Sequence, residues 1–306
     1  MGRTRQPSPV HGPNTQPVVV CCRASAQYGT VTDVVGIHGI AQQQSGRYQL
    51  LDAWLPALRD GVERATNRDR YDPTLDLVYY GDLFLRSVGE IKGPAVLDDL
   101  SEDSLRFLAD LQEEIVDPFT PADPAKAKRG LKELPTPVAR LATWLDNRFG
   151  AAGKILFFGD LVQVRRYQRD DELAAKILDR ATDVLALRPR VLVGHSLGSV
   201  IAYDILCRVP DHGVETLITL GSPLALHTVR HGLRPPRSSS PRLPPGVARW
   251  VNVYDPHDAV ACAGGVQPHW TEAVDRVVDN ERDPHAVTRY LGKRPTGEAV
   301  LAGLET

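Results

Sequence analysis

The chain has no hydrophobic run long enough to cross a membrane, since no run in its 306 residues approaches the roughly 18 apolar residues that a transmembrane helix needs. It has no excess of charge of either sign, because 36 lysines and arginines stand against 38 aspartates and glutamates, a formal charge of −2. No overall field therefore favours nucleic acid or an anionic membrane as a partner. Cysteine is scarce, and the four present show no disulfide or metal-site spacing.

The few cysteines and the start of the chain bear on its compartment. Cys207 falls in a predicted core helix, which indicates a reducing, cytoplasmic environment. The apolar stretch Val18–Cys22 has five residues, fewer than the roughly 7–15 of a secretory signal peptide. We therefore expect residues 1–30 to form a disordered tail and residues 31–306 to form a single domain.

The sequence does contain an alternation of short apolar runs with helical patterns. Hydrophobic residues make up 42% and charged residues 24%, which suits a globular core. The predicted strands are residues 32–37, 75–80, 190–193, 215–220, 249–254 and 273–278. Helical patterns, such as the apolar stripe in residues 47–66, lie between them. The alternation predicts an α/β fold with a doubly wound, mostly parallel sheet, whose ligands bind at the carboxyl ends of the strands.

Two stretches interrupt this alternation. Between about residues 85 and 150, the apolar residues follow two helical stripes, and Thr136-Pro137 marks the expected start of the second. This helical insertion is predicted either to cap an active site or only to pack on the sheet. Residues 227–248 are rich in proline, arginine and serine and predict a long mobile loop.

A short internal echo brackets the insertion. YYGDLF at 79–84 and FFGDLV at 157–162 share the order aromatic-aromatic-Gly-Asp-Leu. Their glycines could allow two hinges of a lid, because glycine tolerates turn conformations. Coincidence is the alternative, and no larger repeat accompanies the pair.

The motif Gly-His-Ser-Leu-Gly follows the apolar strand that ends at Val193. A sharp strand-to-helix turn places its serine, Ser196, in a strained backbone conformation, and Gly194 and Gly198 remove side chains that would collide there. The N–H of Leu197, at the helix start, would point towards a developing negative charge. We predict that Ser196 is a nucleophile. The alternative is a serine that only caps a helix.

A second N–H donor beside the nucleophile is expected from the segment GIHGIAQQQ. His38-Gly39 lets the chain turn after the first strand, so that the N–H of Ile40, or less favourably that of Gly39 or Ala41, points into the site. His38 is interpreted as an organiser of this loop rather than a catalyst. His195 is interpreted as a packing or supporting residue, because adjacent side chains diverge at such a turn.

The acid is expected after the nucleophile in the chain, followed by the base. The segment VNVYDPHDAVA offers Asp255 and Asp258 directly after a predicted strand. Asp255 could cap the turn through its side chain. Asp258 is favoured as the acid because the loop bends back towards the nucleophile there, and Asp255 is the alternative.

Three late histidines compete for the role of base. His257 is held beside the acid, and His269 precedes the last predicted strand. His285 follows that strand and leads into a short predicted helix, so it is the favoured base. It would remove the Ser196 proton while Asp258 orients the imidazole. The alternative is a surface histidine before a helix.

Taken together, HGI, GHSLGS, GSP at 221–223, WVNVYDPHDAVA and a late histidine resemble the α/β-hydrolase superfamily, over roughly residues 31–292. The likeness is to its lipase- and esterase-like branch, including bacterial relatives of the deacylases that act on glycosylphosphatidylinositol lipids. The resemblance implies a catalytic set of Ser196, Asp258 and His285, with backbone donors at Ile40 and Leu197. It implies hydrolysis of a lipid or other acyl ester without a cofactor or metal.

Other functions stay open on the same residues. A thioester or amide substrate would use the same machinery. A non-catalytic protein of this fold could instead act as a binding or regulatory partner of an unidentified protein. A third possibility is an enzyme held inactive by its cap until a partner or interface opens it.

Overall fold

The structure is a computed structural model that describes most of the chain. It describes residues 1–2, 32–40, 42, 45–66, 71–84, 100–121, 128–129, 132–234 and 242–305. Its contacts divide the chain into Met1–Thr30 and Val31–Thr306, and every helix and strand reported below belongs to the second unit. The predicted disordered tail, apart from its first two residues, lies outside the described residues.

A six-stranded, all-parallel sheet forms the centre of this unit, in the order β2-β1-β5-β6-β7-β8. Its strands are β1 (Val34–Ile37), β2 (Leu75–Val78), β5 (Val191–His195), β6 (Thr216–Leu220), β7 (Arg249–Tyr254) and β8 (Ala273–Val277). All six predicted strands are present, which confirms the α/β class. A separate antiparallel pair consists of β3 (Lys128–Arg129) and β4 (Lys132–Glu133).

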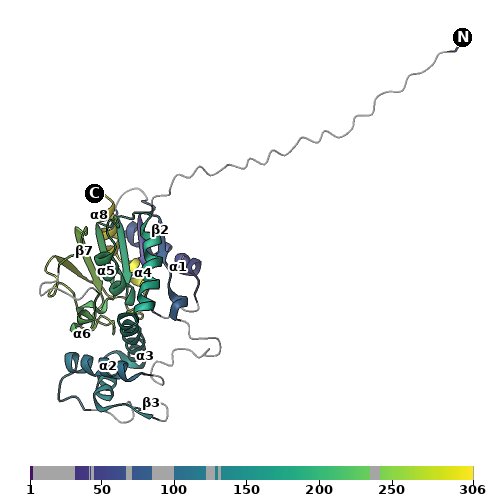
Figure 1. Ribbon diagram of the computed structural model, residues 1–306. Helices are drawn as coiled ribbons and strands as arrows, with labels where there is room; N and C mark the ends of the chain where they lie inside the picture. The colour runs from purple at the N-terminus through teal and green to yellow at the C-terminus, as the bar shows by residue number, and fades with distance from the viewer. Residues whose placement is uncertain are drawn as a thin grey trace. The chain divides into compact units, whose positions relative to one another are not determined.

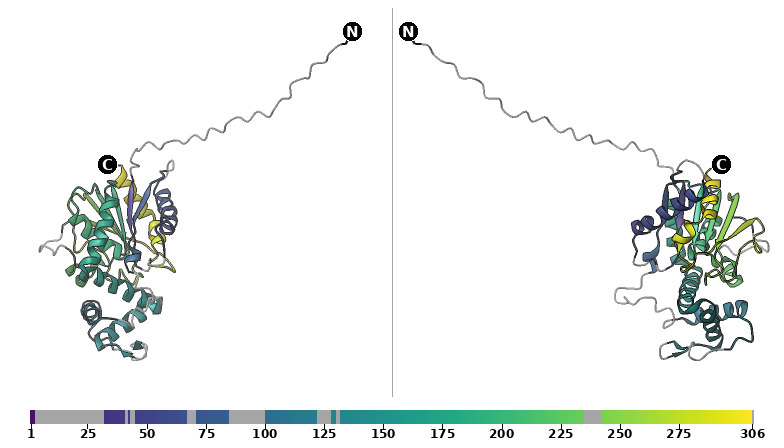
Figure 2. Two further views of the ribbon diagram at one scale, coloured as in Figure 1. Left: turned by 45° about the vertical axis from the view of Figure 1, so that its right-hand side comes forward. Right: turned by 180° about the vertical axis from the view of Figure 1, so that it is seen from behind.

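Helices cover both faces of the sheet (Figures 1 and 2). The helices of the described residues are α1 (Arg47–Ala65), α2 (Glu102–Ile115), α3 (Thr136–Arg169), α4 (Asp171–Leu185), α5 (Leu197–Arg208), α6 (His227–His231), α7 (Val287–Leu291) and α8 (Arg294–Leu304), with short 3₁₀ turns at η1 (Gly81–Phe84) and η2 (Pro223–Ala225). Of these, α2 packs on α3 and α6, beyond the end of the sheet. Alternate strand residues point to opposite faces. Val34 therefore packs in the cluster that includes α1 and α8, and Val35 packs in the cluster that includes α3, α4 and α5.

The helical stretch after β2 extends further than predicted. Residues 151–169 are helical as well, so α3 continues to Arg169 beyond the kink at Gly150, close to where the insertion is expected to end. The second half of α3 is held by buried apolar side chains, among them Phe157, Phe158 and Leu161. Gly159 lies inside the helix, so it is not a hinge. The break falls instead at Gly150, whose φ of 73° only glycine adopts readily.

The stretch 227–248, predicted to be a mobile loop, begins with a short helix. Residues His227–His231 form α6, because Glu114 of α2 accepts hydrogen bonds from the backbone N–H groups of His227 and Thr228 and from the Thr228 hydroxyl. This contact joins residues more than a hundred positions apart, so local composition could not reveal it. Residues 235–241 of the predicted loop lie outside the described residues.

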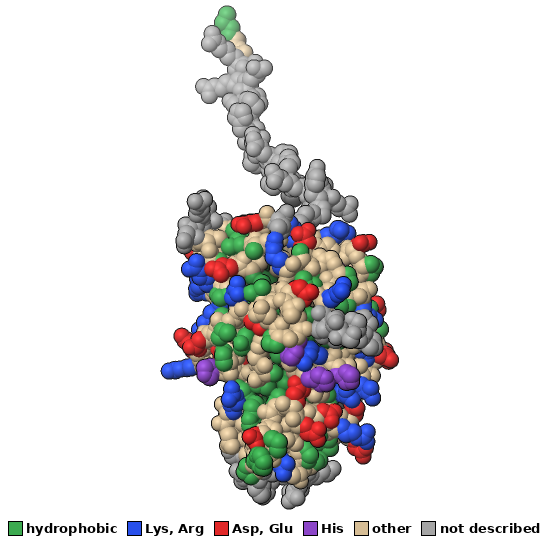
Figure 3. Space-filling model, turned by 90° about the vertical axis from the view of Figure 1, so that its left-hand side faces the viewer, with side chains coloured by type: hydrophobic (Ala, Val, Ile, Leu, Met, Phe, Trp, Pro, Cys, Tyr) green, Lys and Arg blue, Asp and Glu red, His purple; other side chains and the backbone are tan. Residues whose placement is uncertain are grey.

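The surface agrees with the balanced composition. Acidic and basic side chains are interspersed with apolar ones on the face that Figure 3 shows. Within the described part of the chain, no helix combines the length and apolarity needed to span a bilayer.

Helices α1 and α8 meet at a pair of glycines. A Cβ on Gly61 would lie 2.0 Å from the carbonyl oxygen of Leu291, and a Cβ on Gly297 would lie 2.0 Å from the carbonyl oxygen of Gly61. A side chain at Gly61 would therefore push α1 away from Leu291 at the end of α7, and one at Gly297 would push α8 away from α1.

We expect Gly61→Ala to lower the free energy of unfolding by about 1–3 kcal/mol, because the overpacking cost exceeds the gain in helix propensity. Urea denaturation would measure this. Asp52→Ala, on the exposed side of the same helix, is the control and should change stability by less than about 0.5 kcal/mol. Equal stability of the two variants would contradict the close packing.

Candidate active site

The candidate site lies where the chain reverses its direction across the sheet. From β1 the chain moves to β2 on one side, and it later returns to β5 on the other side of β1. Connections that leave neighbouring parallel strands in opposite directions open a crevice at their carboxyl ends. The loop His38–Ile40 follows β1, and Ser196 follows β5. The fold therefore brings these two segments together.

Ser196 occupies a strained turn between β5 and α5. Its φ of 57° and ψ of −128° lie outside the regions that ordinary residues prefer. The turn is held by a hydrogen bond from the Ser196 N–H to the Leu220 carbonyl (3.0 Å). It also needs small neighbours, because a Cβ on Gly198 would lie 2.1 Å from the Ile37 carbonyl oxygen, and one on Gly194 would lie 2.7 Å from the Gly198 carbonyl oxygen.

Asp258 and His285 form a buried pair next to this turn. The His285 Nδ1–H donates to the Asp258 carboxylate, with Nδ1 2.9 Å from Oδ1 and 2.8 Å from Oδ2. The Tyr290 hydroxyl (2.8 Å) and the Val260 N–H (2.9 Å) also donate to Asp258. Asp258 is fully buried, so these three donors replace the water it has lost.

The environment of His285 favours its charged form. Burial by itself would lower the pKa of His285, but the charge of Asp258, the hydrogen bond to it and the charge of Asp160 raise the pKa above its ordinary value. With Nδ1 bound to Asp258, the second ring nitrogen, Nε2, is free to exchange a proton.

Asp255, His257 and His269, the other candidates from sequence, make different contacts. Asp255 accepts hydrogen bonds from the backbone N–H groups of His257 (2.8 Å) and Asn280 (2.5 Å), and so joins two loops. The side chain of His257 is 77% exposed, and His269 packs edge-on against Trp270. Of the two candidate acids, Asp258 is the one that contacts His285.

His195 and His38 hold the surrounding backbone. The His195 Nε2–H donates to the carbonyl oxygen of His285 (2.9 Å), and burial keeps the pKa of His195 well below its ordinary value. The His38 Nδ1–H donates to the Gly39 carbonyl (2.7 Å), while its Nε2 accepts from the Tyr80 N–H (3.1 Å). Burial lowers the pKa of His38 to about 4. Both rings are therefore neutral supports for loops.

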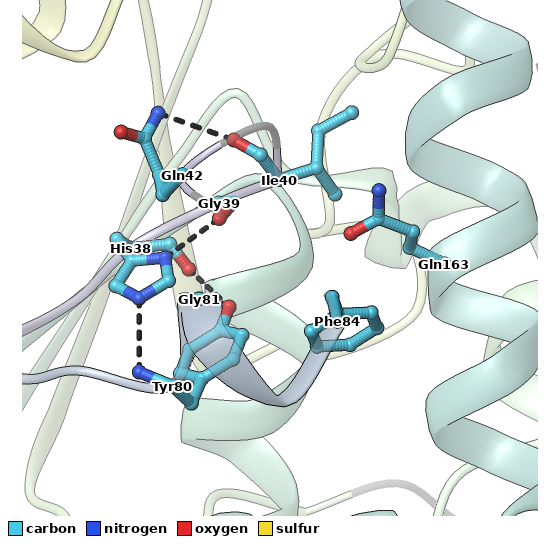
Figure 4. Close-up of a pocket in the computed structure, with 8 residues that line it drawn as sticks. All are labelled: His38, Gly39, Ile40, Gln42, Tyr80, Gly81, Phe84 and Gln163. Carbon is cyan, nitrogen blue, oxygen red and sulfur yellow. Dashed lines mark hydrogen bonds between the residues drawn. The ribbon is translucent and has the colours of Figure 1, made fainter. Parts of the chain in front are cut away.

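The loop after β1 lies directly against the turn at Ser196. A Cβ on Gly39 would lie 2.8 Å from the Cβ of Ser196 and 3.0 Å from His195 Nδ1. Ile40 faces a small pocket with Phe84 and with Gln163 of α3 (Figure 4). The volume open to a water-sized molecule there is about 0 Å³, whereas typical ligand pockets hold roughly 300–1,000 Å³. Ala41, the less favoured donor, lies outside the described residues.

One contact was absent from the sequence prediction. The Ser196 hydroxyl donates its hydrogen bond to the carboxylate of Asp160, on α3. His285 Nε2 is buried and has no hydrogen-bond partner among the described residues. The structure thus gathers Ser196, Asp258 and His285 at one end of the sheet, but the serine proton points to Asp160.

Two residues of this site were missed from sequence. Asp160 lies in the second copy of the aromatic-aromatic-Gly-Asp-Leu echo, which was the one signal that could have drawn attention to it. The aspartate of the first copy, Asp82, forms an ion pair with Arg180 instead. Tyr290 has no local signal, because its role depends on contacts with both Asp255 and Asp258.

The arrangement combines a serine in a strained turn, an imidazole paired with a carboxylate, and a backbone N–H at a helix start, which are groups that acyl transfer can use. Within the described residues, no three His, Cys, Asp or Glu side chains come together in a way that could hold a metal ion. In comparisons with protein-family models, curated proteins and solved structures, nothing matches the chain.

The Asp258–His285 pair can be tested by titration. We expect Asp258→Asn to lower the pKa of His285, because the variant removes the charge that opposes the effect of burial. NMR titration of imidazole-labelled protein would measure the shift. His257→Gln, which removes an exposed imidazole, is the control and should leave the pKa of His285 in place. An unchanged His285 pKa in Asp258→Asn would contradict the pairing.

Proposed function

We propose that this chain is a serine hydrolase of the α/β-hydrolase type, which cleaves a carboxylic ester through an acyl-enzyme on Ser196. The observation that carries the proposal is the strained turn at Ser196 beside the buried Asp258–His285 pair. The parallel sheet supports it, because the serine follows a central strand and the acid and histidine come later in the chain, in the order typical of this fold.

In the proposed mechanism, His285 Nε2 takes the proton of the Ser196 hydroxyl as its oxygen attacks the ester carbonyl. The carbonyl oxygen gains negative charge, which the N–H groups of Leu197 and Ile40 stabilise. The intermediate then expels the alcohol, which takes the proton from His285. Water attacks the acyl-enzyme by the same route, giving the carboxylic acid and restoring Ser196.

The substrate class is an acyl ester, with a lipid ester as the favoured kind. Helix α3 lies over the site through Asp160 and Gln163, and we assign it, with α2, the role of a cap. Thioesters and amides require the same steps, so the choice among them depends on the leaving group and on the shape of the opened pocket.

A second candidate is a hydrolase-fold protein whose activity is absent or controlled by a partner. The observation that favours it is the hydrogen bond from Ser196 to Asp160, since a serine that donates to Asp160 does not donate to His285. The two candidates differ in whether Ser196 reacts.

A fluorophosphonate probe, which reacts with activated serines, separates these candidates. We expect the folded protein to be labelled, and we expect Ser196→Ala to abolish the labelling. Ester hydrolysis should fall by about 10³-fold or more in both Ser196→Ala and His285→Ala, because the two side chains act as a unit. Ser222→Ala removes a neighbouring serine hydroxyl and is the control. A folded wild-type protein that neither reacts nor hydrolyses any ester would exclude the enzyme.

The rate should also depend on pH. The proposed base must be neutral, and its pKa is raised above the ordinary 6.5, so kcat/KM should increase with pH and have its acidic midpoint above that value. A pH profile with a short-chain ester would measure it. An acidic midpoint below 6 would contradict the assignment of His285 in this environment.

A further inference from the structure

Asp160 lies beside Ser196, where the proposed mechanism puts the negatively charged oxygen of the substrate. Its carboxylate accepts the hydroxyl hydrogen of Ser196. The backbone N–H of Leu197 also faces this carboxylate: burial raises the pKa of Asp160, and the nearby Leu197 N–H partly opposes that effect. These are the nucleophile and one of the two donors that the proposed mechanism gives to the substrate carbonyl. A negatively charged oxygen already lies in that position.

Two polar atoms of this site lack a hydrogen-bond partner among the described residues. Asp160 is fully buried, and its Oδ2 has no hydrogen-bond partner among the described residues. The same is true of His285 Nε2. Burial raises the pKa of Asp160 to about 6, even though the charge of His285 and the Ser196 hydrogen bond lower it. A buried carboxylate with an unpaired oxygen is unfavourable, so this contact does not serve stability alone.

Each contact of Asp160 would slow the proposed reaction. With Asp160 in place, the Ser196 proton is directed away from His285, and the Leu197 N–H faces a carboxylate and not a substrate oxygen. The charge of Asp160 also raises the pKa of His285, which favours the protonated imidazole that cannot act as a base. A fixed negative charge beside a developing oxyanion would further raise the barrier.

We propose that Asp160 is an inhibitory side chain built into helix α3, which occupies the oxyanion position and holds Ser196 inactive until the helix withdraws. This inference rests on the proposed hydrolase function and names how that function is controlled. Asp160 and Gln163 lie one turn apart on α3, so the same movement that frees Ser196 would open the small pocket beside Ile40.

The cap helix has the parts needed for such a movement. Gly150 interrupts α3, and a Cβ there would have no atom within 4 Å, so residues 151–169 form a separate helical segment. The ion pair between Lys154 and Asp146 (3.2 Å) spans the interruption. Arg165 binds Asp103 of α2 through two hydrogen bonds of 2.6 Å. Polar contacts tie the segment to α2, while Phe157, Phe158 and Leu161 pack in the apolar core. The withdrawal is therefore a shift of the segment that keeps these side chains packed and not its release from the core.

The test compares rates of fluorophosphonate labelling of Ser196 in the full chain. If the uninhibited state is populated at about a tenth or less of the wild-type protein, Asp160→Ala should increase the second-order labelling rate by about tenfold or more. Hydrolysis of a short-chain ester should increase in parallel. Asp160→Asn keeps the shape but removes the charge and should give a smaller increase. Asp179→Ala, an exposed aspartate on the neighbouring helix α4, is the matched control and should match the wild type.

Three outcomes are distinguishable. Faster labelling of Asp160→Ala, abolished when Ser196→Ala is added, supports the inhibitory role. A labelling rate within about twofold of wild type, or a loss of activity as large as that of Ser196→Ala in a folded variant, overturns it while the hydrolase stands. If neither the wild type nor any Asp160 variant reacts although all are folded, the hydrolase function fails and the inhibitory role fails with it. Asp160→Asn serves as the decisive variant should Asp160→Ala not fold.

Discussion

The site depends on one constraint, the left-handed backbone at Ser196 where β5 passes into α5. The buried parallel strand, paired on both sides, sets the position of this turn, and the start of α5 sets its direction. Gly194 and Gly198 make it possible, because the backbone of β1 and of α5 approaches more closely than any side chain would allow. A strained conformation of this kind persists only where the surrounding structure fixes it, and such sites are commonly functional.

Two buried carboxylates bind different groups around this turn. Asp258 is satisfied by three donors and holds His285 in one orientation. Asp160 is only partly satisfied and binds the serine itself. This difference has a physical consequence. A carboxylate with all its hydrogen bonds made holds its partners in place, whereas a buried carboxylate oxygen without a partner lowers the free-energy cost of moving that carboxylate away. The structure thus combines a fully bonded Asp258–His285 pair with a carboxylate, Asp160, that is only partly bonded.

The sequence predicted the secondary-structure elements correctly where the pattern of apolar residues lies within the element itself. The six strands followed from short apolar runs, and α1 followed from its apolar stripe. It failed for the second half of α3, because FFGDLV resembles a hinge when tertiary contacts are unknown, although Phe157 and Phe158 are buried in the core. It also failed for α6, which is held in place by Glu114, far away in the chain.

By itself, the sequence determined the parallel sheet and the strand-to-helix turn at Ser196, because apolar periodicity and glycine spacing act over a few residues. Only the tertiary structure decided that Asp258 and not Asp255 contacts His285, that Tyr290 supports this pair, and that Asp160 binds Ser196. Each of these contacts joins side chains from separate elements. Their distances are therefore set by how helices and strands pack, which no local pattern encodes.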